Sequence, residues 1–217
     1  MTRPSPLPNR ITPLGDAVAA TARGAWTGNR GVIHRGHDIA KRCGTDGWVC
    51  CVTDFRGRRR KLMQPGRWTE LFFLDEATAF AAGHRPCYFC RRTDALRFAE
   101  AWAKGQGREG RASAPEMDAV LKHERAHVGR RRDWERRKFF AELAVVKEGE
   151  LAPGAMIAAG DELRPYLFTG EGFVRWSFDG YAPETPVGPL RLLTPASAVA
   201  AFRAGYAPQV HPSAGLS

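Results

Sequence analysis

Two cysteines, Cys87 and Cys90, have the spacing at which one short loop brings two thiolates to the same metal ion. In such a C-x-x-C loop both side chains point inward, and each sulfur reaches a shared zinc ion at about 2.3 Å. Redox dithiols use the same spacing, but they usually follow a strand directly and open a helix. Here the pair follows a segment with helical signals, and arginines on both sides would offset the charge of a thiolate-rich site. These surroundings favour metal binding over redox chemistry.

Upstream residues must complete a site of four ligands. The candidates are His34, His37, Cys43, Cys50 and Cys51. The runs 31–34 and 48–52 are rich in strand-favouring residues, and a hairpin that pairs position 34 with position 51 would set His34 beside Cys51. Because side chains alternate along a strand, Cys50 would pack in the sheet while Cys51 faces the metal.

These arguments predict a closed, structural Cys₃His zinc site. Its four ligands would be His34, Cys51, Cys87 and Cys90. Simple burial in a strand explains Cys50 and Cys51 equally well, because free cysteine behaves as a small hydrophobic residue. Cys43 and Cys50 remain alternative ligands.

Basic residues form two runs, 56–61 and 130–138, and Trp134 interrupts the second. Guanidinium groups bind phosphates through paired hydrogen bonds, and interleaved aromatic rings can stack on bases. The first run and the arginines around the cysteine pair therefore predict a nucleic-acid-binding surface. Its residues would be Arg58, Arg59, Arg60, Lys61, Arg85, Arg91 and Arg92. A solvated turn and a solvated helix face are the alternative explanations of the two runs.

The segment His123-Glu124-Arg125-Ala126-His127 matches H-E-x-x-H, the helix pattern of zinc peptidases. Arg125 places a cation inside the motif, and Gly129 with an arginine run follows at once, so the helix barely continues past the second histidine. An exposed polar helix end is the better interpretation, and a peptidase is a minor alternative.

The bulk composition is that of a globular protein, with 43% hydrophobic and 26% charged residues. A formal net charge of +10 favours a polyanionic partner, although an arginine-rich composition alone would produce the same charge. No apolar run approaches the roughly 18 residues needed to cross a membrane. The N-terminus lacks the apolar core of a signal peptide, and the odd number of cysteines favours reduced thiols. We therefore expect a cytoplasmic protein.

The predicted elements divide the chain into a small unit of sheet and helices and a second, mostly β unit with a C-terminal helix, an α+β fold. Helical signals run from Asp75, a helix cap, to Gly83, and from Thr93 to Gly105. The predicted strands of the second unit are 155–158, 163–168, 173–178 and 190–193, followed by a helix at 196–204. The predicted division is a flexible, proline-rich arm (1–27), a zinc-binding unit (28–104), a linker (105–115), a second unit (116–211) and a tail (212–217).

The stretch FFLDEATAFAAGHRPCYFCRR resembles the second half of the zinc-binding domain of the Ada family of DNA methyl-phosphotriester repair proteins. The matching positions are Phe73, Glu76, Ala77, Ala81, Ala82, Gly83, Arg85, Pro86, Cys87, Cys90 and Arg91. The resemblance covers residues 70–92 and at its widest 28–92. It implies that Cys87 and Cys90 bind zinc, and it favours DNA over RNA as the partner. The family's Cys-x-x-x-Cys pair, which holds the methyl-accepting cysteine, is missing here, as are its alkylguanine-repair motif and a helix-turn-helix.

Residues and resemblance together predict a zinc protein that binds nucleic acid, in DNA repair or damage recognition. One alternative is a repair enzyme that accepts a methyl group on a zinc-bound cysteine, with Cys51 as the acceptor. Another is a protein-interaction module whose fold is stabilised by the zinc ion. Apart from Cys51 in the first alternative, no catalytic residue is predicted.

Overall fold

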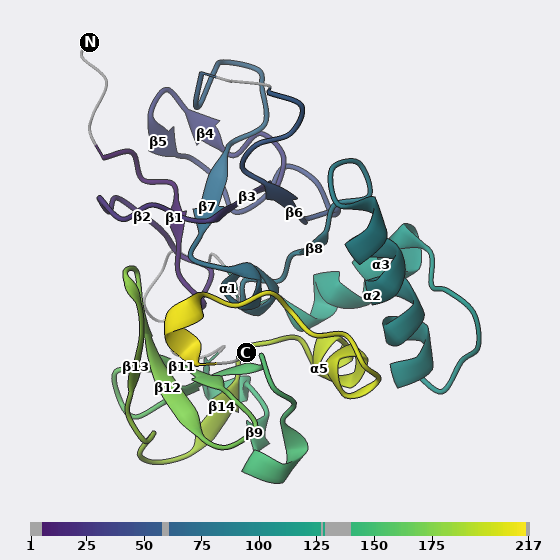
Figure 1. Cartoon of the computed structure of the whole chain (residues 1–217). Helices are drawn as coiled ribbons and strands as arrows, with labels where there is room; N and C mark the ends of the chain where they lie inside the picture. The colour runs from purple at the N-terminus through teal and green to yellow at the C-terminus, as the bar shows by residue number, and fades with distance from the viewer. Residues whose placement is uncertain (1–5, 58–60, 127, 129–139, 216–217) are drawn as a thin grey trace.

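The computed structural model describes residues 6–57, 61–126, 128 and 140–215, and its fold is α+β, as predicted. Two six-stranded sheets lie on either side of helix α1 (Glu76–Ala81), which contacts strands of both (Figure 1). The first sheet and its helices come from the N-terminal part of the chain, and the second sheet is followed by a C-terminal helix.

The first sheet is mixed and carries the candidate site. Its order is β2 (Ala17–Val18), β1 (Arg10–Ile11), β7 (Leu71–Phe73), β3 (Trp26–Asn29), β6 (Val49–Val52) and β8 (Arg85–Pro86). β1 runs parallel to β7 and β8 runs parallel to β6, whereas the other pairs are antiparallel. A separate hairpin is formed by β4 (His34–Arg35) and β5 (Asp38–Ile39).

The prediction of a flexible arm over residues 1–27 is wrong for residues 6–27. They supply β1, β2 and the start of β3, and Ile11 is completely buried. Arg10 pairs with Phe72, and the short turn from β1 to β2 closes through a hydrogen bond from Gly15 N to Thr12 O of 2.8 Å. Prolines exclude a helix from this segment, but they permit short strands at a sheet edge.

Local signals correctly located the first helix. The Asp75 carboxylate accepts a hydrogen bond of 2.8 Å from the amide of Thr78, as an N-cap residue does. Gly83 has φ of +79°, and a Cβ there would meet the Arg125 side chain at 2.7 Å, so only glycine fits. The other helices are α2 (Arg92–Gly105), α3 (Ala114–Glu124) and α5 (Ala196–Arg203). Thr93 does not cap α2, which begins one residue earlier.

The second sheet is entirely antiparallel. Its order is β13 (Gly180–Pro183), β12 (Phe173–Ser177), β11 (Arg164–Phe168), β10 (Met156–Ala159), β14 (Leu190–Leu192) and β9 (Val145–Val146). Two short 3-10 helices, η1 (Glu148–Glu150) and η2 (Pro212–Ala214), complete the described elements. Four of these strands and α5 lie where the sequence predicts them, whereas β13 and β9 were not predicted.

One hydrophobic core joins residues on both sides of the predicted linker 105–115. Phe80 of α1 contacts Phe98 of α2 and Phe202 of α5, with ring centroids 5.0 and 5.1 Å apart. α3, expected to open the second unit, is tied to the first one through the Arg85–Asp118 ion pair. The described residues therefore show no break between cores at the linker. No helix among them is long and apolar enough to cross a membrane.

Candidate metal centre

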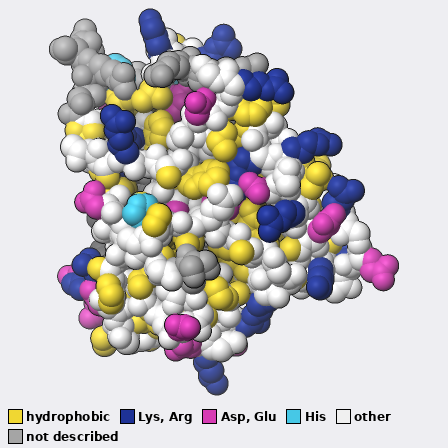
Figure 2. All heavy atoms as spheres, viewed as in Figure 1, with side chains coloured by type: hydrophobic (Ala, Val, Ile, Leu, Met, Phe, Trp, Pro, Cys, Tyr) yellow, Lys and Arg dark blue, Asp and Glu magenta, His cyan; other side chains and the backbone are white. Residues whose placement is uncertain are grey.

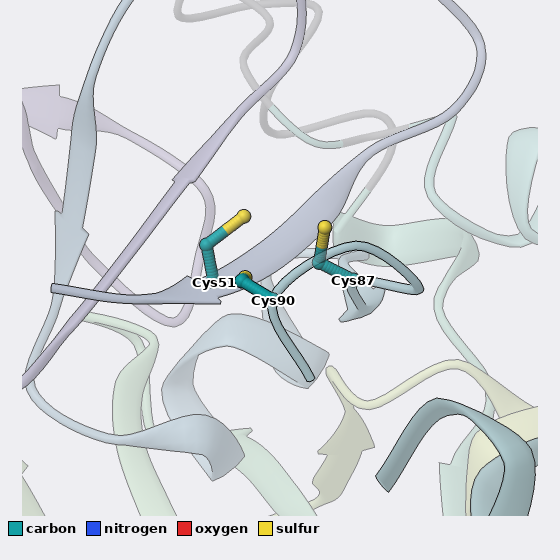
Figure 3. Close-up of side chains that lie close together, drawn as sticks. All are labelled: Cys51, Cys87 and Cys90. Carbon is teal, nitrogen blue, oxygen red and sulfur yellow. The ribbon is translucent and has the colours of Figure 1, made fainter. Parts of the chain in front are cut away.

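Three cysteine side chains converge on one point of the first sheet. The sulfur atoms of Cys51, Cys87 and Cys90 lie within 4.8 Å of one another, close enough to share a metal ion. Figure 3 shows Cys51 on its strand and the other two on the adjoining loop, with the three side chains gathered in one place. Among the described residues, this is the one group of three or more Cys, His, Asp or Glu side chains with that arrangement.

Strand alternation positions Cys51. β6 lies between β3 and β8, so Cys50 enters the core with 1% of its surface exposed while Cys51 projects from the opposite face. The predicted assignment of Cys50 to packing and Cys51 to the site is therefore confirmed.

The Cys87–Cys90 loop is anchored at both ends by backbone hydrogen bonds. The amide of Cys87 donates to the carbonyl of Cys50 at 3.0 Å, which continues the parallel pairing of β8 with β6. The amide of Arg91 donates to the carbonyl of Cys87 at 2.9 Å and leads into α2. The pair therefore follows a strand directly and leads into a helix, and the expectation that it does not is wrong. The short strand places both loop thiols beside Cys51, and this third thiol is what distinguishes the group from a simple dithiol.

The electrostatics of the three thiols stabilise one negative charge among them. Hydrogen bonds from the Cys51 and Cys90 thiols, and from loop amides, lower the pKa of Cys87 to about 2. Hydrogen bonding to the other two cysteines, together with burial, raises the pKa of Cys51. The hydrogen bond with Cys51 lowers the pKa of Cys90, but its interaction with Cys87 and its burial outweigh that effect and raise it. A metal ion must displace the remaining thiol protons, so its binding releases protons.

An open cleft of about 650 Å³ borders the three thiols. It lies over one face of the first sheet, because most of its strand residues alternate along the central strands: Thr27 and Asn29 of β3, Val49 and Cys51 of β6, and Phe72 of β7. Val52, at the end of β6, also lines it. The other walls come from the loops, with Thr53, Asp54, Phe55, Gly57, Leu62, Trp68, Glu70 and Phe89. Sequence reasoning missed this cleft; the aromatic residue inside the C-x-x-C loop was the available signal.

The structure does not bring His34 to the thiols, and the hairpin that placed it there is wrong. Cys51 pairs with Thr27 of β3, whereas His34 pairs with Ile39 in the separate hairpin. Both ring nitrogens of His34 have partners elsewhere, Thr69 Oγ1 at 2.6 Å and Gln64 O at 3.2 Å. The polar segment between the two runs forms its own small hairpin, and so an earlier strand takes the place beside β6.

Two of the arginines predicted to bind phosphates have partners inside the protein. Arg85 donates two hydrogen bonds to the Asp118 carboxylate, at 2.8 and 2.7 Å. Arg91 forms an ion pair of 2.7 Å with Glu76, and its side chain is 1% exposed. The position of Arg85 and Arg91 next to the C-x-x-C loop in the sequence gives no information about these acidic partners. Neither arginine fits the predicted role of a phosphate ligand.

The remaining predicted cations are placed as follows. Lys61 and Arg92 are exposed, and Arg58, Arg59 and Arg60 lie outside the described residues, as does the whole of the second basic run. On the face shown in Figure 2, Lys and Arg side chains are spread over the surface with acidic ones between them. This face therefore carries no single block of positive charge.

The H-E-x-x-H segment is not a formed metal site in the described residues. α3 ends at Glu124, whose carboxylate accepts hydrogen bonds from the amide and hydroxyl of Ser197 at the start of α5. His127 lies outside the described residues. Arg125 is buried, and its guanidinium lies 4.2 Å from the ring centre of Trp48. Glu124 and Arg125 thus connect elements of the fold.

No family model, curated protein or solved structure matches this chain.

Proposed function

We propose that the chain is a zinc-binding protein that acts on nucleic acid, in DNA repair or damage recognition. The observation that carries the proposal is the convergence of Cys51, Cys87 and Cys90 at an open cleft. Thiolates are soft ligands that suit zinc, and zinc sites with three protein ligands keep a fourth position for water or substrate. Since the described residues offer no fourth ligand in this group, a three-thiolate site open to the cleft fits better than a closed Cys₃His site.

Charge and sequence resemblance support nucleic acid as the partner. The chain has a formal net charge of +10, and the loop that borders the cleft carries the exposed residues Arg56 and Lys61. Zinc bound by three thiolates has a net charge of −1, so cations beside it help a phosphate to approach. The resemblance of residues 70–92 to the Ada zinc-binding domain points to DNA.

A second candidate function is methyl transfer to a zinc-bound thiolate, because the thiols face a cleft that a substrate can enter. The Cys51 sulfur would attack the methyl carbon of a phosphotriester. An S–C bond forms, the ester C–O bond breaks, and the phosphodiester anion leaves. Zinc would keep the sulfur deprotonated at neutral pH. A mass increase of one methylene on the peptide containing Cys51, after incubation with methylated DNA, tests this candidate; full transfer by Cys51→Ser contradicts it.

Metal analysis combined with DNA retention tests the first proposal. We expect one zinc per chain in the wild type and none in Cys87→Ser. Cys43→Ser is the matched control: Cys43 is a half-buried cysteine outside the group, and this variant keeps the metal. Retention of a DNA duplex should fall steeply as salt rises, because phosphate contacts release counterions. Absence of zinc from carefully reduced protein contradicts the metal proposal, and absence of salt-dependent retention contradicts the nucleic-acid proposal.

A further inference from the structure

The cleft beside the thiols is walled by aromatic rings. Phe55, Trp68, Phe72 and Phe89 all line it, together with the three cysteines. They come from four separate segments: the loop after β6, the segment before β7, β7 itself and the C-x-x-C loop. A volume of about 650 Å³ falls within the range of sites that bind small organic groups. The tertiary structure thus collects flat apolar surfaces around one opening.

Phe89 is the most unusual of these rings. It is 65% exposed, although it stands between two cysteines in a loop that is anchored at both ends. Its centroid lies 5.1 Å from that of Phe55, at an interplanar angle of 59°, so the two rings contact each other at the cleft. An exposed phenylalanine on an anchored loop contributes little to the core of this protein, and it presents apolar surface at the edge of the cleft.

Charge and polarity around the rings favour a nucleobase over a purely apolar ligand. The Arg56 guanidinium lies 5.1 Å from the centre of the Phe55 ring, and Lys61 is exposed in the same loop. Asn29 and Glu70 also line the cleft, where their oxygens can accept hydrogen bonds from a base edge. The amide of Met63 donates to Glu70 Oε2 at 2.9 Å and so holds that carboxylate in place.

We propose that the cleft binds an unpaired nucleobase, which stacks on Phe89 and contacts the neighbouring Phe55 ring, while the neighbouring cations contact the phosphates on either side. The inference rests on the proposed nucleic-acid function and specifies its ligand as single-stranded nucleic acid or a base displaced from a duplex. A base inside a duplex is covered by its neighbours, whereas an unpaired base presents a free face to an aromatic ring. Stacking requires no bound metal, and the thiolate centre lies next to the group that the cleft would bind.

Fluorescence anisotropy with labelled 12-nucleotide DNA tests the proposal on the full-length protein. Three probes are compared: a single strand, an abasic strand with the same backbone, and a duplex. We expect the single strand to bind about 5- to 150-fold more tightly than the abasic strand, the range found for stacking of one base. Phe89→Ala should lose this advantage, whereas Phe89→Trp should keep it. Neither variant should change the salt dependence, because the phosphate contacts remain.

Val187→Ala is the matched control. Val187 is 79% exposed and lies outside the cleft, so this variant removes a comparable exposed apolar group and should bind all probes as the wild type does. Equal affinity for the single and abasic strands, or an unchanged preference in Phe89→Ala, would overturn the cleft proposal and leave phosphate binding intact. Failure to bind any probe at low salt would overturn the nucleic-acid function itself, and this inference with it.

Discussion

Two polar clusters lie close to helix α1, and they differ in where their partners come from. Buried Asp75 and Glu76 are fully engaged within the protein. Asp75 accepts hydrogen bonds from Thr78 and, through Oδ2, from the Tyr181 hydroxyl at 2.7 Å and the His211 amide at 3.0 Å. Burial, followed by the neighbouring carboxylate, raises the pKa of Tyr181, so this hydroxyl stays protonated and remains a donor.

The Glu76 carboxylate also has several partners within the protein. It forms an ion pair with Arg91 and accepts hydrogen bonds from the Tyr206 hydroxyl at 2.6 Å and the Gln209 amide at 2.8 Å. Tyr206 and Gln209, like Tyr181 and His211, belong to the C-terminal part of the chain, so the two carboxylates connect that part to the first sheet. Both carboxylates therefore make their hydrogen bonds and ion pairs within the folded protein.

The three thiols show the opposite pattern. Their side-chain partners are chiefly one another, and they line an open cleft. The comparison teaches that a polar cluster satisfied by distant parts of the chain is structural, whereas a cluster of metal-ligating side chains that chiefly contact one another indicates a site. Arg91 connects the two, because it follows Cys90 directly and pairs with Glu76.

The largest expected effect comes from breaking the structural cluster. Glu76→Gln removes the charge that faces buried Arg91, and we expect a loss of about 3 kcal/mol in the free energy of unfolding, at the lower end for a broken buried pair. Asp94, which also contacts Arg91, limits the loss. Denaturant titration measures the effect.

Glu100→Gln is the matched control for this change, because Glu100 pairs with Arg111 on the surface with 60% of its side chain exposed. It should cost less than about 0.5 kcal/mol. Zinc content should be unchanged in both variants. Loss of zinc in Glu76→Gln would contradict the division into a structural cluster and a metal site.

Removing metal should produce the next largest effect. If the free metal concentration is 100 times Kd, binding stabilises the folded chain by about 2.7 kcal/mol, so chelation should lower Tm by about 5–11 °C. Differential scanning calorimetry with and without chelator measures this change. Cys87→Ser should melt at the same temperature in both conditions, and a chelator effect of equal size in that variant would contradict the assigned site.

The smallest effect concerns buried His84, whose ring nitrogens contact the Arg30 guanidinium and the Ala79 carbonyl, each at 3.3 Å. Its pKa lies well below the usual value because of burial first and the cations Arg30 and Arg125 second. In the unfolded chain His84 binds a proton as the pH falls through about 6.5, whereas in the folded chain it stays neutral. Its contribution to the free energy of unfolding is therefore fully present above that pH and is lost as the pH falls below it. We expect a loss of about 1.2 kcal/mol between pH 7 and pH 5.5.

Denaturant titrations of wild type and His84→Gln at both pH values isolate this contribution. The variant should lose about 1.2 kcal/mol less than the wild type over the interval. Identical pH dependence of the two proteins would contradict the assignment to His84.

Short-range rules accounted for several elements and for most of the candidate site. Asp75 and Gly83 delimit α1 through a cap and a left-handed residue, features that depend on a few neighbouring positions. The C-x-x-C spacing identified Cys87 and Cys90, and strand alternation separated Cys51 from Cys50. Each of these predictions needed only local geometry, and the structure agrees with the helix ends, with the burial of Cys50 and with the grouping of the three thiols.

The wrong predictions about the site depended on pairing between distant segments. The partner of β6 is β3, from the segment interpreted as an arm, and so His34 lies in another hairpin. Arg85 and Arg91 looked like phosphate ligands until the fold set Asp118 and Glu76 against them. Sheet register and buried ion pairs depend on how the whole core packs, and a single sequence carries little information about either.

The amino-acid sequence alone was sufficient for the α+β class, the principal helices and the thiol-rich loop, because periodicity, caps and ligand spacing act over a few residues. Only the tertiary structure decided that, among the described residues, three thiols gather without His34, and that aromatic rings from four segments line the cleft beside them. The physical reason is that a site of this kind forms where strands pair across long intervals of sequence. Those pairings are selected by the free energy of the complete core.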